Sequence, residues 1–431
     1  MKTILFEDTP SDNPGMDFTK TAQVISKKII SSNAKKLTVG IFGGYGSGKT
    51  TLMNSISKEL KVNNDVVVVN FEAWRYDKED DLIKPFLANL LKNDDIQSKR
   101  PNLSKKAHAA LRGMIRGISL KGAFFSFSAD KAIAAEENYL ETLEQKYLND
   151  YINGYELINE ITRHQNDENL KVVVIIDDLD RCIPAKAFSL IECLKSLLDI
   201  PGLFFILGID PRVITTYLLS KYGQEFCVSP EDYLQKIFPI SYYLPKPTSK
   251  DIYKEIKCIL NKISDQEYDQ SEVKWRNDIG QVLRISFNSE TIPNIDNYNL
   301  IEYMPKNLRQ VKRILNLHQI LMSQRNDKFD SELLLVMLII KMQWPIGYWG
   351  IFSIKTNFRT EISACQREVK DSILYKKVKN NMEVLSELLS DSFIQLYDNF
   401  IYNKQLHHHL DCYCEAIGWP IEIDAIMNNK E

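Results

Sequence analysis

One eight-residue stretch constrains the fold of this chain more than any other. It fits the pattern GxxxxGK[ST] of a phosphate-binding loop, and its residues are Gly43, Gly44, Tyr45, Gly46, Ser47, Gly48, Lys49 and Thr50. An apolar stretch, 37–42, precedes the loop, and a helix-forming run, 52–60, comes after it. Glycines let the backbone coil tightly, so that its N–H groups point at one anion, which the positive end of the next helix also attracts. The sequence therefore predicts a strand, a phosphate-binding loop and a helix, in this order.

Three side chains at the end of this loop carry the predicted contacts to a nucleotide and its metal ion. Lys49 would reach the β- and γ-phosphates. The hydroxyl of Thr50 would take one coordination position on Mg²⁺, which prefers hard oxygen ligands, and Thr51 is a lesser candidate for a contact. ATP and Mg²⁺ are therefore the predicted ligands. Whether GTP is excluded stays open, because residues 17–25, where contacts to the base are expected, follow no readable code.

A second motif places acidic residues at the end of another predicted strand. The five β-branched residues 172–176 are typical of a buried parallel strand, and Asp177 comes where such a strand reaches its C-terminal edge. Asp177 is thus the predicted carboxylate ligand of Mg²⁺. Asp178 comes next and is predicted to orient or deprotonate the attacking water; alternatively, it only braces the loop. For Asp180 and Arg181, a local ion pair or a partner contact is favoured over a chemical role.

Two further acidic residues end predicted strands and are candidates for sensing the nucleotide. Asp210 comes after the stretch 203–207, and it either senses the nucleotide or forms an Asp-Pro turn that starts the next helix. Glu72 directly follows the stretch 66–71. It would approach the attacking water or couple the nucleotide to a neighbouring protein, and the alternative is that this segment only packs its aromatic residues.

A basic amphipathic helix is predicted further along the chain, over residues 306–324. Its apolar residues recur at helical spacing, which is typical of a helical lid. An arginine on such a lid can stabilise the charge of the γ-phosphate during transfer. Arg313 or Arg309 is the candidate for this part, and a surface salt bridge is the alternative for either residue.

The order of the predicted elements is that of an α/β protein. Its predicted strands are 37–42, 66–71, 172–176, 203–207 and 240–244. Strands that alternate with helices need right-handed crossovers and form a parallel sheet, whose ligand site lies outside the C-terminal ends of the strands. If the strand 203–207 inserts between the strands that lead to Gly43 and Asp177, its end should lie near the γ-phosphate. The predicted domains are a nucleotide-binding domain with an insertion, a helical lid and a C-terminal helical domain, at 1–260 (insertion 95–165), 261–330 and 331–431.

The charge of the chain argues against a general nucleic-acid binder, because the formal net charge is only -3. The insertion is locally different. Its first part, 96–121, holds seven basic residues and no acidic one: Lys99, Arg100, Lys105, Lys106, Arg112, Arg116 and Lys121. This basic stretch, 99–121, is either a solvated helix face or a surface for nucleic acid, a membrane surface or a protein partner.

Cysteine usage and the N-terminus predict a cytoplasmic protein. Seven cysteines are an odd number without a tight framework, which fits reduced thiols. Glu7 and Asp8 interrupt any apolar core that a secretory signal would need. The longest apolar run, 333–340, is far shorter than the roughly twenty residues that cross a bilayer, so no membrane insertion is expected.

In combination, five segments resemble the KAP-type P-loop NTPases. They are the phosphate-binding loop and the segments 71–76, 177–182, 207–210 and 233–238. The resemblance covers about residues 17–345. It implies an ATPase of the additional-strand (ASCE) P-loop type, related to the AAA+ and STAND groups. It also implies a link to anti-phage defence, because several bacterial members of the family serve in the exclusion of bacteriophage.

Three positions depart from the pattern of this family. Glu72 stands where Asn is common, Tyr45 where Trp is common, and Leu308 where Pro is usual. The first departure bears on catalysis, whereas the other two look tolerable. Many members also carry transmembrane helices between the two nucleotide motifs, and no such segment is found in this chain.

Two functions of different classes are compatible with these observations. The first is a Mg²⁺-dependent ATPase that acts as a motor or switch in bacterial defence, coupled to lid motion and to assembly as a homo-oligomer. The second is a nucleotide-gated scaffold that scarcely hydrolyses ATP and recruits an effector protein. A third, phosphorylation of a small substrate, ranks last because no acceptor-binding motif is visible. The trigger, the effector and the size of the oligomer stay open.

Overall fold

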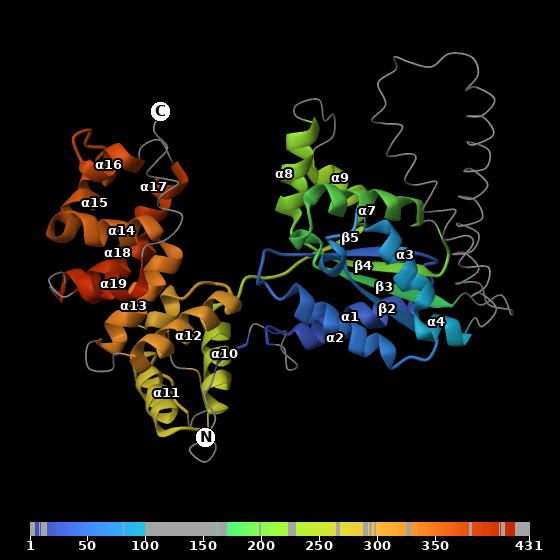
Figure 1. Cartoon of the computed structure of the whole chain (residues 1–431), viewed down its shortest axis with the longest axis horizontal. Coiled ribbons are helices and arrows are strands. Elements are labelled where there is room, and N and C mark those ends of the chain that lie inside the picture. The colour runs from blue at the N-terminus through green and yellow to red at the C-terminus, as the bar shows by residue number, and fades with distance from the viewer. Residues whose placement is uncertain are drawn as a thin grey trace. The chain divides into compact units, whose positions relative to one another are not determined.

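The chain divides into two compact units, which are described separately (Figure 1). The computed structural model describes residues 5–7, 9, 15–99, 162 and 170–418, with gaps at 81, 198–199, 223–229, 264–267, 288–291, 293–294, 297–298, 325–328, 379–381, 405 and 407–409. The first unit, here called the sheet unit, is Pro10–Pro245. The second, here called the helical unit, is Lys246–Glu431 together with Met1–Thr9.

A five-stranded sheet forms the centre of the sheet unit. Its strands are β1 (Leu37–Phe42), β2 (Val66–Glu72), β3 (Lys171–Asp177), β4 (Leu203–Ile209) and β5 (Ile240–Tyr243). They lie in the order β2-β3-β4-β1-β5, and each adjacent pair is parallel. The predicted α/β fold is thus confirmed, including the insertion of β4 between β1 and β3, which is the additional-strand arrangement. The register pairs Phe42 with Ile209 and Glu72 with Asp177, so the C-terminal ends of the strands meet at one edge.

Helices cover both faces of this sheet (Figure 1). On one face lie α1 (Phe18–Ser31) and α2 (Lys49–Lys61). On the other face lie α3 (Ile83–Lys92), α7 (Pro184–Leu197), α8 (Pro211–Tyr222) and α9 (Pro230–Ile237). Shorter elements are α4 (Asp94–Lys99) and the 3₁₀ turns η1 (Ala73–Tyr76) and η2 (Leu179–Arg181). The inner strands β3 and β4 are buried on both sides because both faces of the sheet are covered, which explains their near-continuous apolar runs.

A partly buried lysine, Lys171, links α1 to the start of β3. The ammonium of Lys171 donates to the carbonyl oxygens of Ile29, Ile30 and Ser32 at 3.0, 2.6 and 2.9 Å. Carbonyls at the end of a helix have no partner within the helix, and a cation there also complements the helix dipole. This contact fixes α1, and with it Phe18, beside the phosphate-binding loop.

The helical unit consists of helices around one common core. They are α10 (Ser249–Asn261), α11 (Gln270–Val282), η4 (Leu300–Tyr303), α12 (Leu308–Gln324), α13 (Ser331–Gln343), α14 (Pro345–Ile354), η5 (Lys355–Asn357), α15 (Phe358–Gln366), α16 (Ile373–Val378), α17 (Met382–Leu388), α18 (Asp391–Tyr397), the π-helical turn η6 (Asp398–Tyr402) and α19 (Asp411–Ile417). The central helix is α13, whose residues 333–340 are all buried. In the part of the chain that the structure describes, no helix is long and apolar enough to span a bilayer.

The division between the units differs from the boundary at 260 that the sequence predicts. Helix α10 belongs to the helical unit, because Ile252, Tyr253, Ile256 and Leu260 are buried in its core. A capping box formed by Thr248 and Asp251 starts this helix just after the boundary. The segments predicted as lid and C-terminal domain also share this one core.

A buried histidine couples the helical unit to pH. His318 accepts a hydrogen bond from Trp275 Nε1 at its Nδ1 (3.0 Å) and donates from Nε2 to the carbonyl oxygen of Ser331 (3.0 Å). Burial lowers the pKa of His318 to about 4. In the unfolded chain this pKa is near its ordinary value of about 6.5. The unfolded chain therefore takes up the proton first as the pH falls from 6.5 towards 4, and the helical unit loses stability in that window.

We expect the free energy of unfolding of the helical unit to fall by up to about 2 kcal/mol between pH 7 and pH 5 through His318. Urea titrations followed by circular dichroism at both pH values measure this change. The variant His318→Gln does not titrate, so its stability should change less over the same interval. An equal pH dependence in both proteins would contradict the prediction.

Candidate functional site

The phosphate-binding loop joins β1 to α2 at the edge where the strands end. Gly46 and Gly48 have φ values of 77° and 98°, in the left-handed region that favours glycine. A Cβ atom at Gly48 would lie 2.7 Å from the Phe18 ring, and one at Gly44 would lie 2.9 Å from a guanidinium nitrogen of Arg212. Larger residues would therefore strain the loop or displace its neighbours.

Lys49, the first residue of α2, is held by three acceptors. Its Nζ donates to the carbonyl oxygens of Gly43 and Gly44 at 2.9 and 3.2 Å, and forms an ion pair with Asp180 Oδ2 at 2.9 Å. The side chains of Lys49 and Asp180 are each only 8% exposed. Asp180 and Arg181 do not pair with each other: η2 turns the Asp180 carboxylate back towards the loop, whereas Arg181 forms a local ion pair with Asp178.

Thr50 and Asp177 come together although two separate motifs supply them. Asp177, the last residue of β3, is buried, hydrogen-bonds the Thr50 side chain and accepts from the backbone N–H of Asp178 at 2.7 Å. Gly208 of β4 leaves room for it, because a Cβ there would lie 3.0 Å from Asp177 Oδ1. Burial raises the pKa of Asp177 to about 6, and a bound dication would favour the ionised carboxylate. Two hard oxygen donors at one point fit Mg²⁺.

Asp178 is paired with the arginine of its own motif. Its Oδ1 lies 2.9 Å from Arg181 Nε, and its φ of 60° is left-handed. Burial raises the pKa of Asp178, and the positive charge of Arg181 opposes that rise. The Arg181 guanidinium also lies 5.9 Å from the ring of Tyr45 and 5.8 Å from the ring of Trp74. Both rings are about half exposed, so η2 connects Asp178 with an aromatic surface beside the loop.

Glu72 lies opposite Asp177 at the end of β2 and forms an ion pair with Arg75 at 2.5 Å. About half of its side chain is exposed. Its negative charge contributes to the raised pKa of Asp178, after burial as the main cause. Glu72 is thus near the candidate base, and its part in catalysis stays a prediction.

Asp210 starts α8 and also lies beside the loop, so the two interpretations of this residue are compatible. Its carboxylate accepts from the backbone N–H of Arg212 and, in a forked arrangement, from the guanidinium at 3.0 and 2.7 Å. Asp210 Oδ2 would be 3.8 Å from a Cβ at Gly44. Sequence reasoning missed Arg212; the only signal was its place after an Asp-Pro turn at the end of a strand.

One orphaned polar atom tests whether the loop fits a phosphate group. The buried hydroxyl oxygen of Ser47 has no hydrogen-bond partner among the described residues. Such atoms are rare in folded proteins, and a bound phosphate oxygen would supply an acceptor. The Lys49 ammonium lies at the same loop. Thr51 lies in the first turn of α2, partly buried. The residues present therefore fit a nucleotide with its Mg²⁺.

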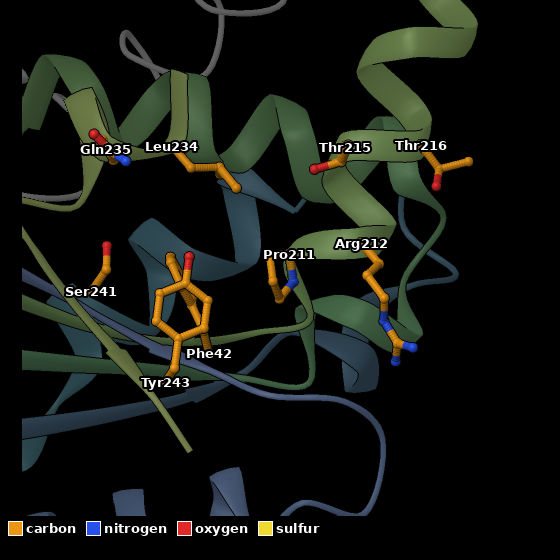
Figure 2. Close-up of a pocket in the computed structure, with 9 residues that line it drawn as sticks. All are labelled: Phe42, Pro211, Arg212, Thr215, Thr216, Leu234, Gln235, Ser241 and Tyr243. Atoms are coloured by element: carbon orange, nitrogen blue, oxygen red, sulfur yellow. The ribbon is translucent and has the colours of Figure 1, made fainter. Parts of the chain in front are cut away.

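A cavity of about 540 Å³ adjoins this loop on the face covered by α8 and α9 (Figure 2). Its lining residues are Phe42, Pro211, Arg212, Thr215, Thr216, Leu234, Gln235, Ser241 and Tyr243. Figure 2 shows the Tyr243 ring lying across Phe42, and the two rings are 5.1 Å apart in an edge arrangement. The residue before Gly43 and the residues after Asp210 thus share one wall.

The two arginines of the predicted lid and the basic stretch 99–121 do not belong to the loop and strand ends described above. Arg309 and Arg313 are on α12 of the helical unit, where Arg313 is exposed, and their action on a phosphate stays a prediction. Of the basic stretch 99–121, only Lys99, at the end of α4, is among the described residues.

Known proteins resemble this chain in sequence and in fold. The profile described as KAP family P-loop domain matches residues 18–324, more than half of the chain. The phage T7 exclusion protein of Escherichia coli K12 is 25% identical over 299 residues, which are 62% of this chain but only 38% of that protein. The match therefore leaves most of that relative uncovered.

Among solved structures, the Aeropyrum pernix ORC2 protein has a TM-score of 0.41 and 12% identity, covering 93% of this chain and 97% of that one. Cdc6p from Pyrobaculum aerophilum has a TM-score of 0.37 and 11% identity, covering 98% and 95%. Likenesses this loose carry no functional argument.

Proposed function

The chain belongs to the KAP family of P-loop domains, and we propose that it is a Mg²⁺-dependent ATPase acting as a switch or motor in the exclusion of bacteriophage. One observation carries this proposal. Lys49 and Thr50 from the loop lie with Asp177, the last residue of β3, and with Asp178 and Asp180, which follow it, at the same edge of the sheet. A lysine for the phosphates, two oxygens for the metal ion and a carboxylate for the water are the groups that phosphoryl transfer to water needs.

Each of these residues has a separate part in the proposed reaction. Lys49 binds the β- and γ-phosphates, and Thr50 and Asp177 hold Mg²⁺, which neutralises phosphate charge when bound. Asp178 orients the attacking water and accepts its proton, and the raised pKa of Asp178 makes it a better acceptor near neutral pH. Asp210, which pairs with Arg212 near Gly44, is assigned the response to the γ-phosphate in this proposal.

The role in phage exclusion is supported by the relative's name and by the family, not by the site. That relative is a phage T7 exclusion protein, and the match covers 38% of it. We therefore propose that nucleotide turnover drives assembly of a homo-oligomer or recruitment of an effector protein. A comparison of ATP turnover with and without DNA or RNA would test whether the basic stretch 99–121 takes part in this function by binding nucleic acid.

A second candidate is a scaffold that binds ATP with little turnover. The ion pair between Asp178 and Arg181 favours it, because a carboxylate committed to a guanidinium is a poor acceptor for a proton. The two candidates differ in one measurement. Phosphate released from ATP by the purified chain distinguishes them, and failure to bind ATP at all would exclude both.

Removal of divalent cations is expected to stop turnover. In EDTA, phosphate release should fall at least about a hundredfold, because the phosphate charge is then no longer neutralised beside Asp177. Addition of excess Mg²⁺ should restore the rate. Phosphate release that persists in EDTA would contradict the assignment of Thr50 and Asp177 to a metal site.

A further inference from the structure

Asp180, two residues after Asp178, binds the Lys49 ammonium that a phosphate group needs. We infer that Asp180 competes with the triphosphate for Lys49 and thereby sets the affinity of the loop for nucleotide, an inference that rests on the proposed function. An ammonium has three donors, and the three acceptors of Lys49 are the carbonyls of Gly43 and Gly44 and the carboxylate of Asp180.

Of these three acceptors, Asp180 is the one that can leave. The two carbonyls belong to the backbone of the loop, in which Gly46 and Gly48 have left-handed φ values. Asp180 contributes a side chain from a short 3₁₀ turn, η2. A phosphate oxygen that binds Lys49 therefore has to replace the carboxylate.

Asp180 and a phosphate group compete for Lys49 because both are negatively charged. Asp180 and Lys49 are both nearly buried, so their attraction is stronger than at the protein surface. A carboxylate and a triphosphate repel each other when both approach one ammonium in such surroundings. The measured affinity for ATP is then the intrinsic affinity reduced by the fraction of molecules in which Lys49 is available.

The same turn connects this competition with the candidate base. Arg181 comes after Asp180 on η2, pairs with Asp178 and rests on the rings of Tyr45 and Trp74. Asp178 itself precedes the turn with a positive φ, which is strained for a residue with a side chain. A shift of η2 that releases Asp180 from Lys49 would also move Arg181 away from Asp178. Arrival of the nucleotide would thus free the carboxylate that acts on the water.

The test is the affinity of the full chain for ATP and for inorganic tripolyphosphate, both with Mg²⁺, measured by calorimetry. Asp180→Asn keeps the shape of the side chain and removes its charge. We expect the Kd for both ligands to fall at least about tenfold, because the competing charge is lost. The effect should be the same for both ligands, because the adenine of ATP takes no part in this competition. Asp180→Ala should change both affinities in the same direction. The control Glu79→Gln removes one exposed negative charge from the same unit and should leave Kd within about twofold.

Four outcomes are informative. Tighter binding of both ligands by folded Asp180 variants supports the competition. Unchanged or weaker binding would overturn it, since Asp180 would then position Lys49 for the phosphate. Tighter binding of ATP but not of tripolyphosphate would also overturn it. Wild-type chain that binds neither ligand would refute the proposed function itself, which is a separate result.

Discussion

Replacing Lys49 with alanine is expected to abolish nucleotide binding and to destabilise the sheet unit at the same time. Affinity for ATP should fall at least about a hundredfold, because a charged contact to the phosphates is lost. Stability should fall by roughly 3 kcal/mol, since Asp180 would be left as a buried charge without its partner. Calorimetry with ATP and urea unfolding of the same preparation measure the two effects.

A double variant separates these two effects. In Lys49→Ala combined with Asp180→Asn the buried charge is gone, so most of the lost stability should return while ATP binding does not. Lys61→Ala is the matched control, because this lysine also lies on α2 but is exposed at its end. It should change stability by less than about 0.5 kcal/mol. ATP binding that survives in Lys49→Ala would remove the basis of the proposed function.

The sheet and the pair Thr50 and Asp177 could be predicted from sequence for a simple physical reason. Buried parallel strands are nearly continuous apolar runs, and the residues just after each run must emerge at the same edge of the sheet. Two motifs that each end a strand are thus brought together by topology alone. The position of β4 between β1 and β3 did not follow from this reasoning; it was implied by the resemblance to additional-strand P-loop ATPases.

The ion pairs inside the second motif could not be predicted in this way. Lys49 and Asp180 are 131 positions apart, and their contact depends on the left-handed backbone at Asp178, which no periodicity reveals. The direction in which the short turn η2 bends decides whether Arg181 contacts Asp178 or Asp180. Side-chain partners in turns depend on local backbone geometry rather than on burial pattern.

The boundary between the two units could not be predicted from the sequence either. Helix α10 has an apolar face, and such a face predicts burial without naming the core that it joins. Residues 245–248, Pro-Lys-Pro-Thr, have the composition of a linker, but the segment is too short to mark the division by composition alone. The capping box at Thr248 marks the start of α10, but helices also begin soon after strands within the sheet unit, so this signal does not locate the boundary.

Asp178→Asn is expected to preserve ATP binding and to reduce turnover by about a hundredfold to ten-thousandfold, the range over which a general base acts. Asparagine suits this position, because it adopts a positive φ more readily than most residues and keeps the shape of the side chain. It cannot accept a proton from water at neutral pH. Single-turnover release of phosphate at saturating ATP, together with the Kd from calorimetry, measures the two quantities separately.

Arg181, the ion-pair partner of Asp178, provides the control. Arg181→Gln removes the guanidinium that holds Asp178, so turnover should rise or stay unchanged rather than collapse, and the pKa of Asp178 should rise further. If Asp178→Asn instead hydrolyses ATP at the wild-type rate, Asp178 only braces the loop. Wild-type chain that binds ATP without releasing phosphate, and keeps its function in the cell, would favour the nucleotide-gated scaffold, because occupancy of the loop would then be the signal.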